Sequence, residues 1–202
     1  MTDTLVHPAA ATEYVARQQL ARVPITPPPG RLWSLAGRIG RRMYGDIPDN
    51  GWALARNRRV LFGILGFERR VASWKALDPQ LKTLATLTAA VEIGCSWCVD
   101  FGWFLAEKDG LDLAKLQHVR QWRDSPLYSP VERAVIEFAE AMTATPPAVT
   151  DAMVAALRAE LGDAATIELT AVVALENQRS RMNAALGLVA QGFSAACRLP
   201  GH

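Results

Sequence analysis

The sequence predicts an all-α protein, and three observations support this class. Apolar residues recur at spacings of three and four along most of the 202 residues, which is the periodicity of amphipathic helices. No stretch alternates apolar and polar residues convincingly, and no Asn-Gly or Asp-Gly pair separates two alternating runs as in a β-hairpin. Proline and glycine stand where helices are expected to begin and end. A chain of this length can bury a core without disulfides or metals, so one helical domain is expected.

The N-terminal residues 1–30 are predicted to form an extended arm. They end in the run from Pro24 to Gly30, whose proline rings oppose both a helix and an inner strand. We expect this arm to be either mobile or laid over a neighbouring subunit. Residues 31–202 are then expected to form a single helical domain, a multi-helical bundle.

Apolar periodicity predicts five helical stretches after the arm. The last runs from about residue 164 to residue 189 and is long enough to contain a break. In each of the first four, apolar residues share one face of a helix. These faces carry Leu32, Leu35, Ala36, Ile39 and Met43; Leu81, Leu84, Thr88 and Val91; Val131, Ala134, Val135, Phe138 and Met142; and Val149, Met153, Ala156, Leu157 and Leu161.

Boundary residues mark several of these helices. Asp78 followed by Pro79 supplies an N-cap acceptor and a proline at the first helical position. The segment 129–132, Ser-Pro-Val-Glu, repeats this pattern and adds the glutamate of a capping box. Gly110 and Gly162 stand where a left-handed residue would end a helix.

Composition and charge exclude several classes of function. The net charge is only +2, and the basic clusters at 38–42 and 56–59 lie among apolar residues, which favours solvated helix faces over a nucleic-acid surface. No run approaches the roughly 20 apolar residues of a membrane span, and residues 1–12 do not resemble a signal peptide. Three cysteines are too few for a secreted disulfide framework. We therefore expect a cytoplasmic protein that binds neither nucleic acid nor membrane.

The chemistry is expected at the segment Cys95-Ser-Trp-Cys98. Gly94 can end the preceding helix, and Ser96 can cap the next one, which we predict over residues 97–108. Cys98 then falls in the first turn, where free backbone N–H groups and the helix dipole favour a thiolate. Cysteines in such positions have a lowered pKa, and a partner thiol three residues away can close a disulfide on a sulfenic acid.

Three other interpretations of the pair stay open. A thioredoxin-like site requires a βαβ unit, which the helical pattern does not supply. A structural zinc site requires four ligands, and beyond the pair the chain offers only Cys197, His7, His118 and His202. The third interpretation is two buried, inert cysteines, which pack like small apolar side chains. We expect neither a metal nor an organic cofactor, and we expect Cys197 to take no part.

Glu92 and Asp100 are the carboxylates nearest to the pair in sequence. Glu92 lies three residues before Cys95, and Asp100 follows Cys98 by two. Either carboxylate can accept a proton from a thiol or shape a peroxide pocket. A solvated helix end for Glu92 and complementarity to the helix dipole for Asp100 are equally open. A carboxylate beside a thiolate also raises the pKa of the thiol, because like charges repel.

Other conspicuous residues favour structural roles. His118 is expected on a helix surface rather than in a proton relay. The aromatic residues around the pair favour core packing or a subunit contact over a substrate pocket; they are Trp97, Phe101, Trp103 and Phe104. Four polar residues on the last helix favour an ion-pair and hydrogen-bond network; they are Glu176, Arg179, Arg181 and Asn183.

With these residues in view, the sequence resembles the carboxymuconolactone decarboxylase family, including its alkylhydroperoxidase D-like branch. Helix, Gly-Cys-x-x-Cys and helix is the core pattern of that family, and it stands here at residues 94–98. Residues 176–187, with Gln191-Gly192-Phe193, are similar to the C-terminal signature of one long-chain subgroup. The resemblance covers roughly residues 50–195. It implies a helical homo-oligomer, a trimer or an assembly of trimers or dimers.

The resemblance also implies roles for the two cysteines. In the peroxidase branch the second cysteine attacks and the first resolves, which implies that Cys98 is the nucleophile and Cys95 its resolving partner. That branch carries a histidine four residues after the second cysteine and a glutamate twelve residues before the first. Here those positions are Gly102 and Thr83. The usual proton relay is therefore absent, which implies slow peroxide reduction.

Three functions follow as hypotheses. The leading one is a thiol-dependent peroxidase or disulfide reductase acting on a small peroxide, with an unidentified thiol as its reductant. The first alternative is an acid–base enzyme like the lactone decarboxylases of the family, which need no redox-active pair. The second alternative is a non-catalytic redox sensor, which suits the missing relay. The presence of both cysteines favours redox chemistry.

Overall fold

The computed structural model describes residues 13–194, so His7, Cys197 and His202 lie outside the described residues. Within this range the chain forms helices and loops and no β-strand, which confirms the predicted all-α class. The helices are α1 (Tyr14–Leu20), α2 (Arg31–Tyr44), α3 (Asp49–Leu54), α4 (Arg58–Val71), α5 (Pro79–Ile93), α6 (Ser96–Lys108), α7 (Leu113–Gln117), α8 (Pro130–Thr143) and α9 (Asp151–Ala185), with a 3-10 turn at Val119–Gln121.

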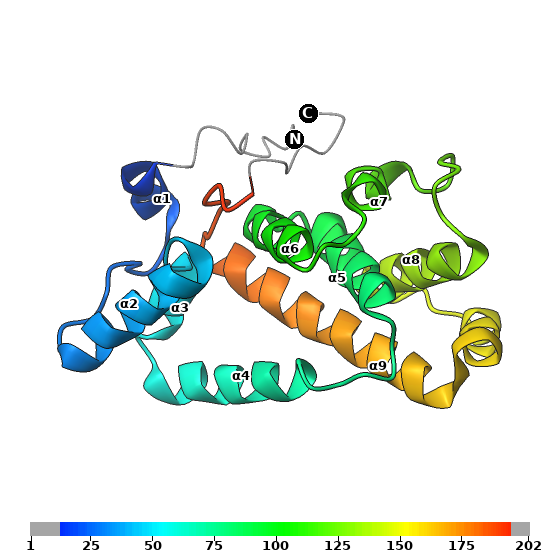
Figure 1. Cartoon of the computed structure of the whole chain (residues 1–202), viewed down its shortest axis with the longest axis horizontal. Coiled ribbons are helices and arrows are strands. Elements are labelled where there is room, and N and C mark those ends of the chain that lie inside the picture. The colour runs from blue at the N-terminus through cyan, green and yellow to red at the C-terminus, as the bar shows by residue number, and fades with distance from the viewer. Residues whose placement is uncertain (1–12, 195–202) are drawn as a thin grey trace.

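Helix α5 is the centre of the fold. It packs against α6, α8 and α9, and α8 also packs against α9 (Figure 1). Leu84, Ala85 and Ala89 of α5 have no exposed surface, because neighbouring helices cover α5 on all sides. Its apolar residues are therefore not confined to one face, as they are on a helix with a solvent side.

The predicted boundaries of α5 and α8 are confirmed. The carboxylate of Asp78 accepts the backbone N–H groups of Gln80 and Leu81, at 2.8 and 3.2 Å. At α8, Ser129 and Glu132 form the reciprocal capping box, since each side chain accepts the backbone N–H of the other residue. Caps of this kind stabilise a helix by about 1 kcal/mol, and they fix where the buried helices begin.

Gly162 interrupts the long C-terminal helix. Helical structure runs from Asp151 to Ala185, but Gly162 has φ 80° and ψ 168°, which are not helical angles. A non-glycine residue rarely adopts a positive φ, so glycine is suited to this kink. The kink therefore lies at Gly162, where the sequence predicted the end of a helix, whereas the break expected within residues 164–189 is not present and the helix continues to Ala185.

The N-terminal segment lies against its own chain. Helix α1, which the sequence analysis did not predict, precedes the expected extended segment. The side chain of Ile25 is only 1% exposed within the core, and Arg22 donates to the carbonyls of Ala184 and Ala185 at the end of α9. These contacts hold the described residues from 13 to 30 against the helical core of the same chain, because that core buries the apolar side chain of Ile25. A contact of this segment with a neighbouring subunit stays a prediction.

Helices α2 and α4 are held loosely by the rest of the molecule. Figure 1 shows α2, α3 and α4 along one side of the helical body formed by α5, α6, α8 and α9. Within residues 13–194, α4 packs closely against α3 alone, and α2 packs closely against no other helix. The apolar face predicted for α2 is half exposed, with Leu35 and Ile39 at 50% and 51%. Among the described helices, none is both long and apolar enough to span a bilayer.

Candidate functional site

The two cysteines lie at the junction between α5 and α6. Gly94 adopts the left-handed conformation (φ 78°, ψ 28°) that ends α5, as expected. Helix α6 then begins at Ser96 with Cys95 as its N-cap residue, so the prediction that Ser96 caps this helix is wrong. The sulfur of Cys95 takes the place of a hydroxyl acceptor, because it accepts the backbone N–H of Cys98 at 3.2 Å.

Cys95 and Cys98 are joined by a disulfide, and their Cα atoms are 5.3 Å apart. Both side chains are buried, with residue exposures of 3% and 8%. The i, i+3 spacing across the first turn of α6 brings the sulfurs together without any long-range requirement. Cys98 lies in this first turn, where backbone N–H groups have no intrahelical acceptor.

Asn183 of α9 is hydrogen-bonded to the pair. Its side-chain amide donates a hydrogen bond from Nδ2 to Sγ of Cys98 at 3.3 Å, and the residue is 5% exposed. The contact joins α9 to the start of α6, across 85 positions of sequence. We expected Asn183 in a polar network and did not expect it beside Cys98. The only signal was its place in the C-terminal signature.

Asp100 binds the segment that follows α9. Its carboxylate accepts four backbone N–H groups at 2.8–3.2 Å, three through Oδ2 and one through Oδ1; they belong to Gln191, Gly192, Phe193 and Ser194. Asp100 is 3% exposed, so this is a buried carboxylate satisfied by backbone donors. The structure thus links the predicted site residue Asp100 to the C-terminal segment and favours an anchoring role for it.

The same segment covers the cysteine loop. The backbone N–H of Ala190 donates to Oγ of Ser96 at 3.3 Å, and Trp97 donates from its indole to Gln191 at 2.9 Å. Gln191 also accepts the backbone N–H of Asp49 at the start of α3. We call residues 188–194 the C-terminal strap. Through these two hydrogen bonds the strap contacts both residues that stand between the cysteines.

Glu92, the other predicted carboxylate, lies at the exposed end of α5. Burial raises its pKa above the ordinary value, and the charge of Glu140 adds to this, while Arg120 and Arg123 act in the opposite direction. Glu92 and Arg181 line a cavity of about 320 Å³ together with Ile93, Thr143, Ala144 and Thr145. This cavity adjoins the chain segment that leads into Cys95.

The two positions of the missing relay are accessible to larger side chains. Gly102 lies on α6 one turn after Cys98, and a Cβ built on it meets no heavy atom within 4 Å. Thr83 lies on α5 and is partly exposed. No steric reason in the described structure therefore requires glycine at position 102.

The polar network predicted on α9 is present for Glu176 and Arg179. Arg179 bridges Glu176 and Glu68 of α4, and Glu176 also accepts the hydroxyl of Ser180 at 2.7 Å. Burial raises the pKa of Glu176, against the lowering effect of Arg179 and Ser180. Arg181 instead donates to the carbonyl of Thr143. This network ties α4 to α9.

The aromatic residues after the pair form a packed cluster with the strap. Trp97 stacks on Phe101 with ring centroids 5.0 Å apart, and Phe101 meets Phe193 edge-on at 5.2 Å. Trp103 is 1% exposed. His118 lies at the partly exposed end of α7, where its Nδ1 contacts the carbonyl of Ala114 at 2.9 Å. These placements agree with core packing for the aromatic residues and a surface position for His118.

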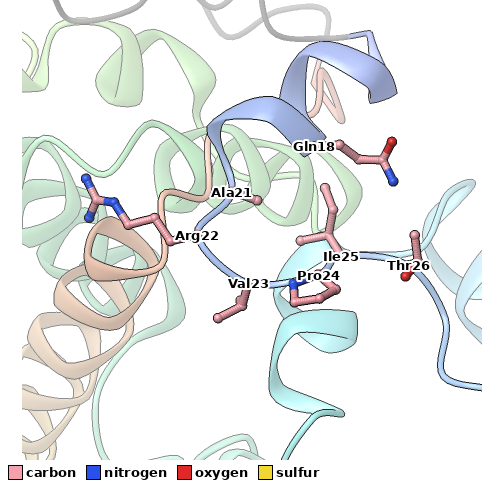
Figure 2. A pocket seen from close by; sticks show the side chains of 7 residues that line it. All are labelled: Gln18, Ala21, Arg22, Val23, Pro24, Ile25 and Thr26. Atoms are coloured by element: carbon pink, nitrogen blue, oxygen red, sulfur yellow. The ribbon is translucent and has the colours of Figure 1, made fainter.

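A second cavity of about 320 Å³ lies along the N-terminal segment (Figure 2). In this view Arg22 extends away from the other labelled side chains towards α9, whose last carbonyls it binds. No cysteine or carboxylate lines this cavity, so we do not place the chemistry there. In the part of the chain that the structure describes, no three His, Cys, Asp or Glu residues are grouped so as to hold a metal.

Sequence comparisons identify relatives of the chain. The profile of the carboxymuconolactone decarboxylase family matches residues 61–141, which include α5, α6 and both cysteines. The uncharacterised protein YnjA of Escherichia coli (strain K12) is 37% identical over 166 residues, which span 80% of this chain and 88% of YnjA.

Solved structures share the fold. The debrominase Bmp8, a cysteine-to-alanine variant in complex with 2,3,4-tribromopyrrole, superposes with a TM-score of 0.73 at 20% identity, over 88% of this chain and 96% of Bmp8. An uncharacterised peroxidase-related protein from Silicibacter sp. TM1040 gives 0.73 at 17% identity, over 86% and 94%. ATU0492 from Agrobacterium tumefaciens, a protein of unknown function proposed as an AhpD antioxidant defence protein, gives 0.62 at 25% identity, over 66% and 91%.

Proposed function

This chain belongs to the carboxymuconolactone decarboxylase family, and we propose that it reduces a small peroxide through the pair Cys95 and Cys98. The observation that carries the proposal is the bonded pair at the N-terminus of α6, with Asn183 donating to the sulfur of Cys98. Three features that favour a reactive thiolate thus meet at one sulfur: a helix start, a resolving partner and a polar donor.

The reaction can be written with atoms and electrons balanced. The thiolate of Cys98 attacks the terminal oxygen of the peroxide, the O–O bond breaks, and the alkoxide or hydroxide that leaves takes a proton. Cys98 is then a sulfenic acid. The thiol of Cys95 attacks that sulfur, water leaves, and the disulfide seen in the structure forms. An external dithiol of unidentified nature reduces the disulfide and is itself oxidised.

The assignment of Cys98 as the attacking thiol rests on its surroundings. Its sulfur accepts the amide of Asn183, whereas the sulfur of Cys95 accepts only the N–H of Cys98 among the hydrogen bonds of the described residues. A hydrogen bond to a charged acceptor is stronger than one to a neutral acceptor, so Asn183 stabilises the thiolate more than the thiol. We expect the hydrogen bond from Asn183 to stabilise the thiolate of Cys98 in the reduced protein. That thiolate then donates its electron pair to the peroxide.

The two carboxylates have different proposed parts in this scheme. Asp100 holds the C-terminal strap and so keeps the loop closed. Glu92, whose pKa is raised and whose side chain lines a cavity with Arg181, is the proposed group for handling the proton of the leaving group. The scheme needs no metal and no organic cofactor, and the reducing cytoplasm would supply the thiol reductant.

The test is peroxide consumption by the reduced protein with defined cysteine variants. Cys98→Ser is expected to abolish consumption. Cys95→Ser is expected to leave a sulfenic acid on Cys98, which a dimedone-type reagent traps for peptide mass spectrometry. Cys197→Ser serves as the matched control and is expected to keep full activity. Peroxide consumption that is unchanged in Cys98→Ser, or a sulfenic acid found on Cys197 instead, would reject the proposal.

The likeness to Bmp8 favours a second candidate, reductive dehalogenation. Replacing carbon-bound bromine by hydrogen takes two electrons, and a dithiol supplies two when it becomes a disulfide; bromide and a proton are the other products. The same variants separate the two functions, because bromide release from a brominated pyrrole measures the second directly. An acid–base decarboxylase would lose no activity in either cysteine variant, and a redox sensor would turn over neither substrate.

A further inference from the structure

Gln191 of the C-terminal strap binds three separate groups of the chain. Its side-chain oxygen accepts the indole N–H of Trp97 at 2.9 Å and the backbone N–H of Asp49 at 2.7 Å. Its side-chain nitrogen donates to the carbonyl of Ile47 at 3.2 Å. These partners stand 94, 142 and 144 positions away in the sequence. Because two N–H donors and one carbonyl meet this amide, it has a single orientation.

The strap does not need this side chain to stay in place. Four backbone N–H groups of the strap, including that of Gln191, donate to the buried carboxylate of Asp100. Those four bonds use no side-chain atom of the strap. The amide of Gln191 therefore acts on the groups that it binds rather than on the anchoring of the strap.

Trp97, the first of these groups, stands between the two cysteines. It is 5% exposed, and its indole is held by the hydrogen bond to Gln191 and by the stacked ring of Phe101. When reduction breaks the bond between the cysteines, the two sulfur atoms move apart to van der Waals distance. The segment 95–98 then moves, and Trp97 moves with it.

The acceptor of this hydrogen bond is fixed from its other side. Asp49 donates the second N–H to the oxygen of Gln191, and the carboxylate of Asp49 pairs with Nε of Arg17 at 2.7 Å. Both side chains of this ion pair are only 5% exposed. Because α1, α3 and the strap hold it, the oxygen of Gln191 does not follow Trp97 when the cysteine loop moves.

We propose that Gln191 is a positioning residue of the redox pair, which holds Trp97 in the place that suits the disulfide and so makes the bond between Cys95 and Cys98 harder to reduce. The hydrogen bond to Trp97 is complete in the bonded state and weakens when the loop opens. A contact that one state makes and the other lacks shifts the equilibrium towards the first state. This role rests on the redox pair of the proposed function, but it does not depend on peroxide as the substrate.

Gln191 and Asn183 act on opposite states of the same pair. Asn183 donates to the sulfur of Cys98 and stabilises the thiolate that reduction produces. Gln191 binds no sulfur in the described structure; it acts through Trp97 on the conformation of the loop. The ease with which a reductant opens the disulfide is then set by the balance between a donor on α9 and an acceptor on the strap.

The experiment is a redox titration of the full-length protein carrying Cys197→Ser, with reduced and oxidised dithiothreitol as the probe. Dithiothreitol passes two electrons and two protons to the disulfide and closes its own ring, so the ratio of its two forms sets the equilibrium. Free thiols are trapped with a maleimide in denaturant and counted by mass spectrometry. Gln191→Met removes the amide at nearly the same side-chain length, and the equilibrium constant for reduction is expected to rise about fivefold, the effect of one ordinary hydrogen bond.

Tryptophan variants test whether the effect passes through the indole. Trp97→Phe keeps a ring that stacks on Phe101 but removes the N–H, and it is expected to raise the constant about fivefold as well. The double variant of Gln191→Met with Trp97→Phe is expected to match either single variant, because both changes remove the same hydrogen bond. Trp103→Phe on the same helix is the matched control and is expected to leave the constant unchanged, since its buried indole N–H has no hydrogen-bond partner among the described residues.

Three outcomes overturn this role and leave the proposed function standing. The first is an unchanged constant in folded Gln191→Met or in Trp97→Phe, because a loss of stability that is equal in both redox states gives no shift. The second is a shift in Trp103→Phe as large as in Trp97→Phe, which would reflect a general loosening of α6. The third is a double variant whose shift is the product of the two single shifts. A parent protein whose pair dithiothreitol does not reduce reversibly would reject this role and the proposed function together.

Discussion

Asn183 donates its side-chain amide to the sulfur of Cys98, although the two residues stand 85 positions apart in the sequence. Asn183 lies near the end of α9, and Cys98 lies in the first turn of α6. Both are buried, so the hydrogen bond is shielded from water. A donor in this position stabilises negative charge on the sulfur, which the backbone N–H groups of the helix start also favour.

Asn183→Ala is expected to make the reduced protein slower with peroxide while it stays folded. A hydrogen bond to a charged group contributes about 1.5–3 kcal/mol, so the pH midpoint for alkylation of Cys98 should rise by about one unit. The measurement is the rate of iodoacetamide labelling against pH in a Cys197→Ser background. Asn177→Ala on the same helix is the control, because Asn177 donates to Thr143 and Val173 instead. An unchanged labelling profile would show that Asn183 only packs against the disulfide.

Asp100→Asn is expected to loosen the C-terminal strap and expose the cysteines. The amide cannot accept four backbone N–H groups as the carboxylate does, so a loss of about 3 kcal/mol in the free energy of unfolding is expected. After mild reduction, the thiols should also label faster than in the wild type. Asp109→Asn, at the exposed end of α6, is the control and is expected to change neither quantity. Equal labelling rates in both variants would contradict the anchoring role.

Glu168→Gln is expected to lower stability at neutral pH and to have little effect in acid. Burial alone would raise the pKa of Glu168, but the ion pair with Lys82 and the N–H groups of Ala76 and Leu77 hold it below its ordinary value. A carboxyl whose pKa is lowered by folding stabilises the fold above its unfolded pKa, and this contribution is lost as the pH falls through the folded pKa.

The difference in unfolding free energy between wild type and Glu168→Gln should therefore be about 1–2 kcal/mol at pH 7 and shrink below pH 4.5, the ordinary value for this carboxyl. Urea unfolding at a series of pH values measures it. Glu160→Gln, exposed on the same helix, is the control and should give a small, flat difference. A difference that grows in acid would mean that the sign assigned to Glu168 is wrong.

Adding the missing relay is expected to raise peroxide turnover. General-base assistance typically contributes about 10²–10⁴-fold, so Gly102→His combined with Thr83→Glu should increase the rate at least about tenfold. The space beyond Gly102 is open, so a histidine is expected to fit. Gly102→Ala is the control, since it raises helix propensity by roughly 1 kcal/mol, which is more than the histidine gains, and adds no base. A folded double variant with unchanged turnover would mean that Glu92 already handles the proton, or that peroxide is not the substrate.

The parts of the fold that depend on neighbouring residues could be predicted from the sequence. The caps at Asp78 and Ser129, and the left-handed Gly94, are local devices, and the structure contains them all. The N-cap of α6 is Cys95, one residue before the predicted Ser96. The sulfur of Cys95 accepts the backbone N–H that a hydroxyl usually accepts. Local chemistry thus placed the pair at a helix start with an error of one position.

The features that depend on distant contacts were not predicted. Asn183 and Asp100 obtain their partners from segments more than 80 residues away, and sequence periodicity carries no information about which side chains meet. Likewise, Ile25 is buried although it lies between prolines, since tertiary packing rather than local preference decides its position. The apolar face of α2 was predicted correctly as a face, but its side chains stay about half exposed in the described chain, which periodicity could not predict.

The four backbone N–H groups that donate to Asp100 belong to residues that the ribosome adds late. They stand 91 to 94 residues after it in the chain, so a growing polypeptide presents Cys95 and Cys98 long before residues 191–194 can fold over them. During that interval the thiols face whatever low-molecular-weight thiols and oxidants surround the ribosome. The thiols of Cys95 and Cys98 are therefore exposed to oxidation before the native structure forms. A mixed disulfide formed on either cysteine during synthesis would oppose the binding of the strap.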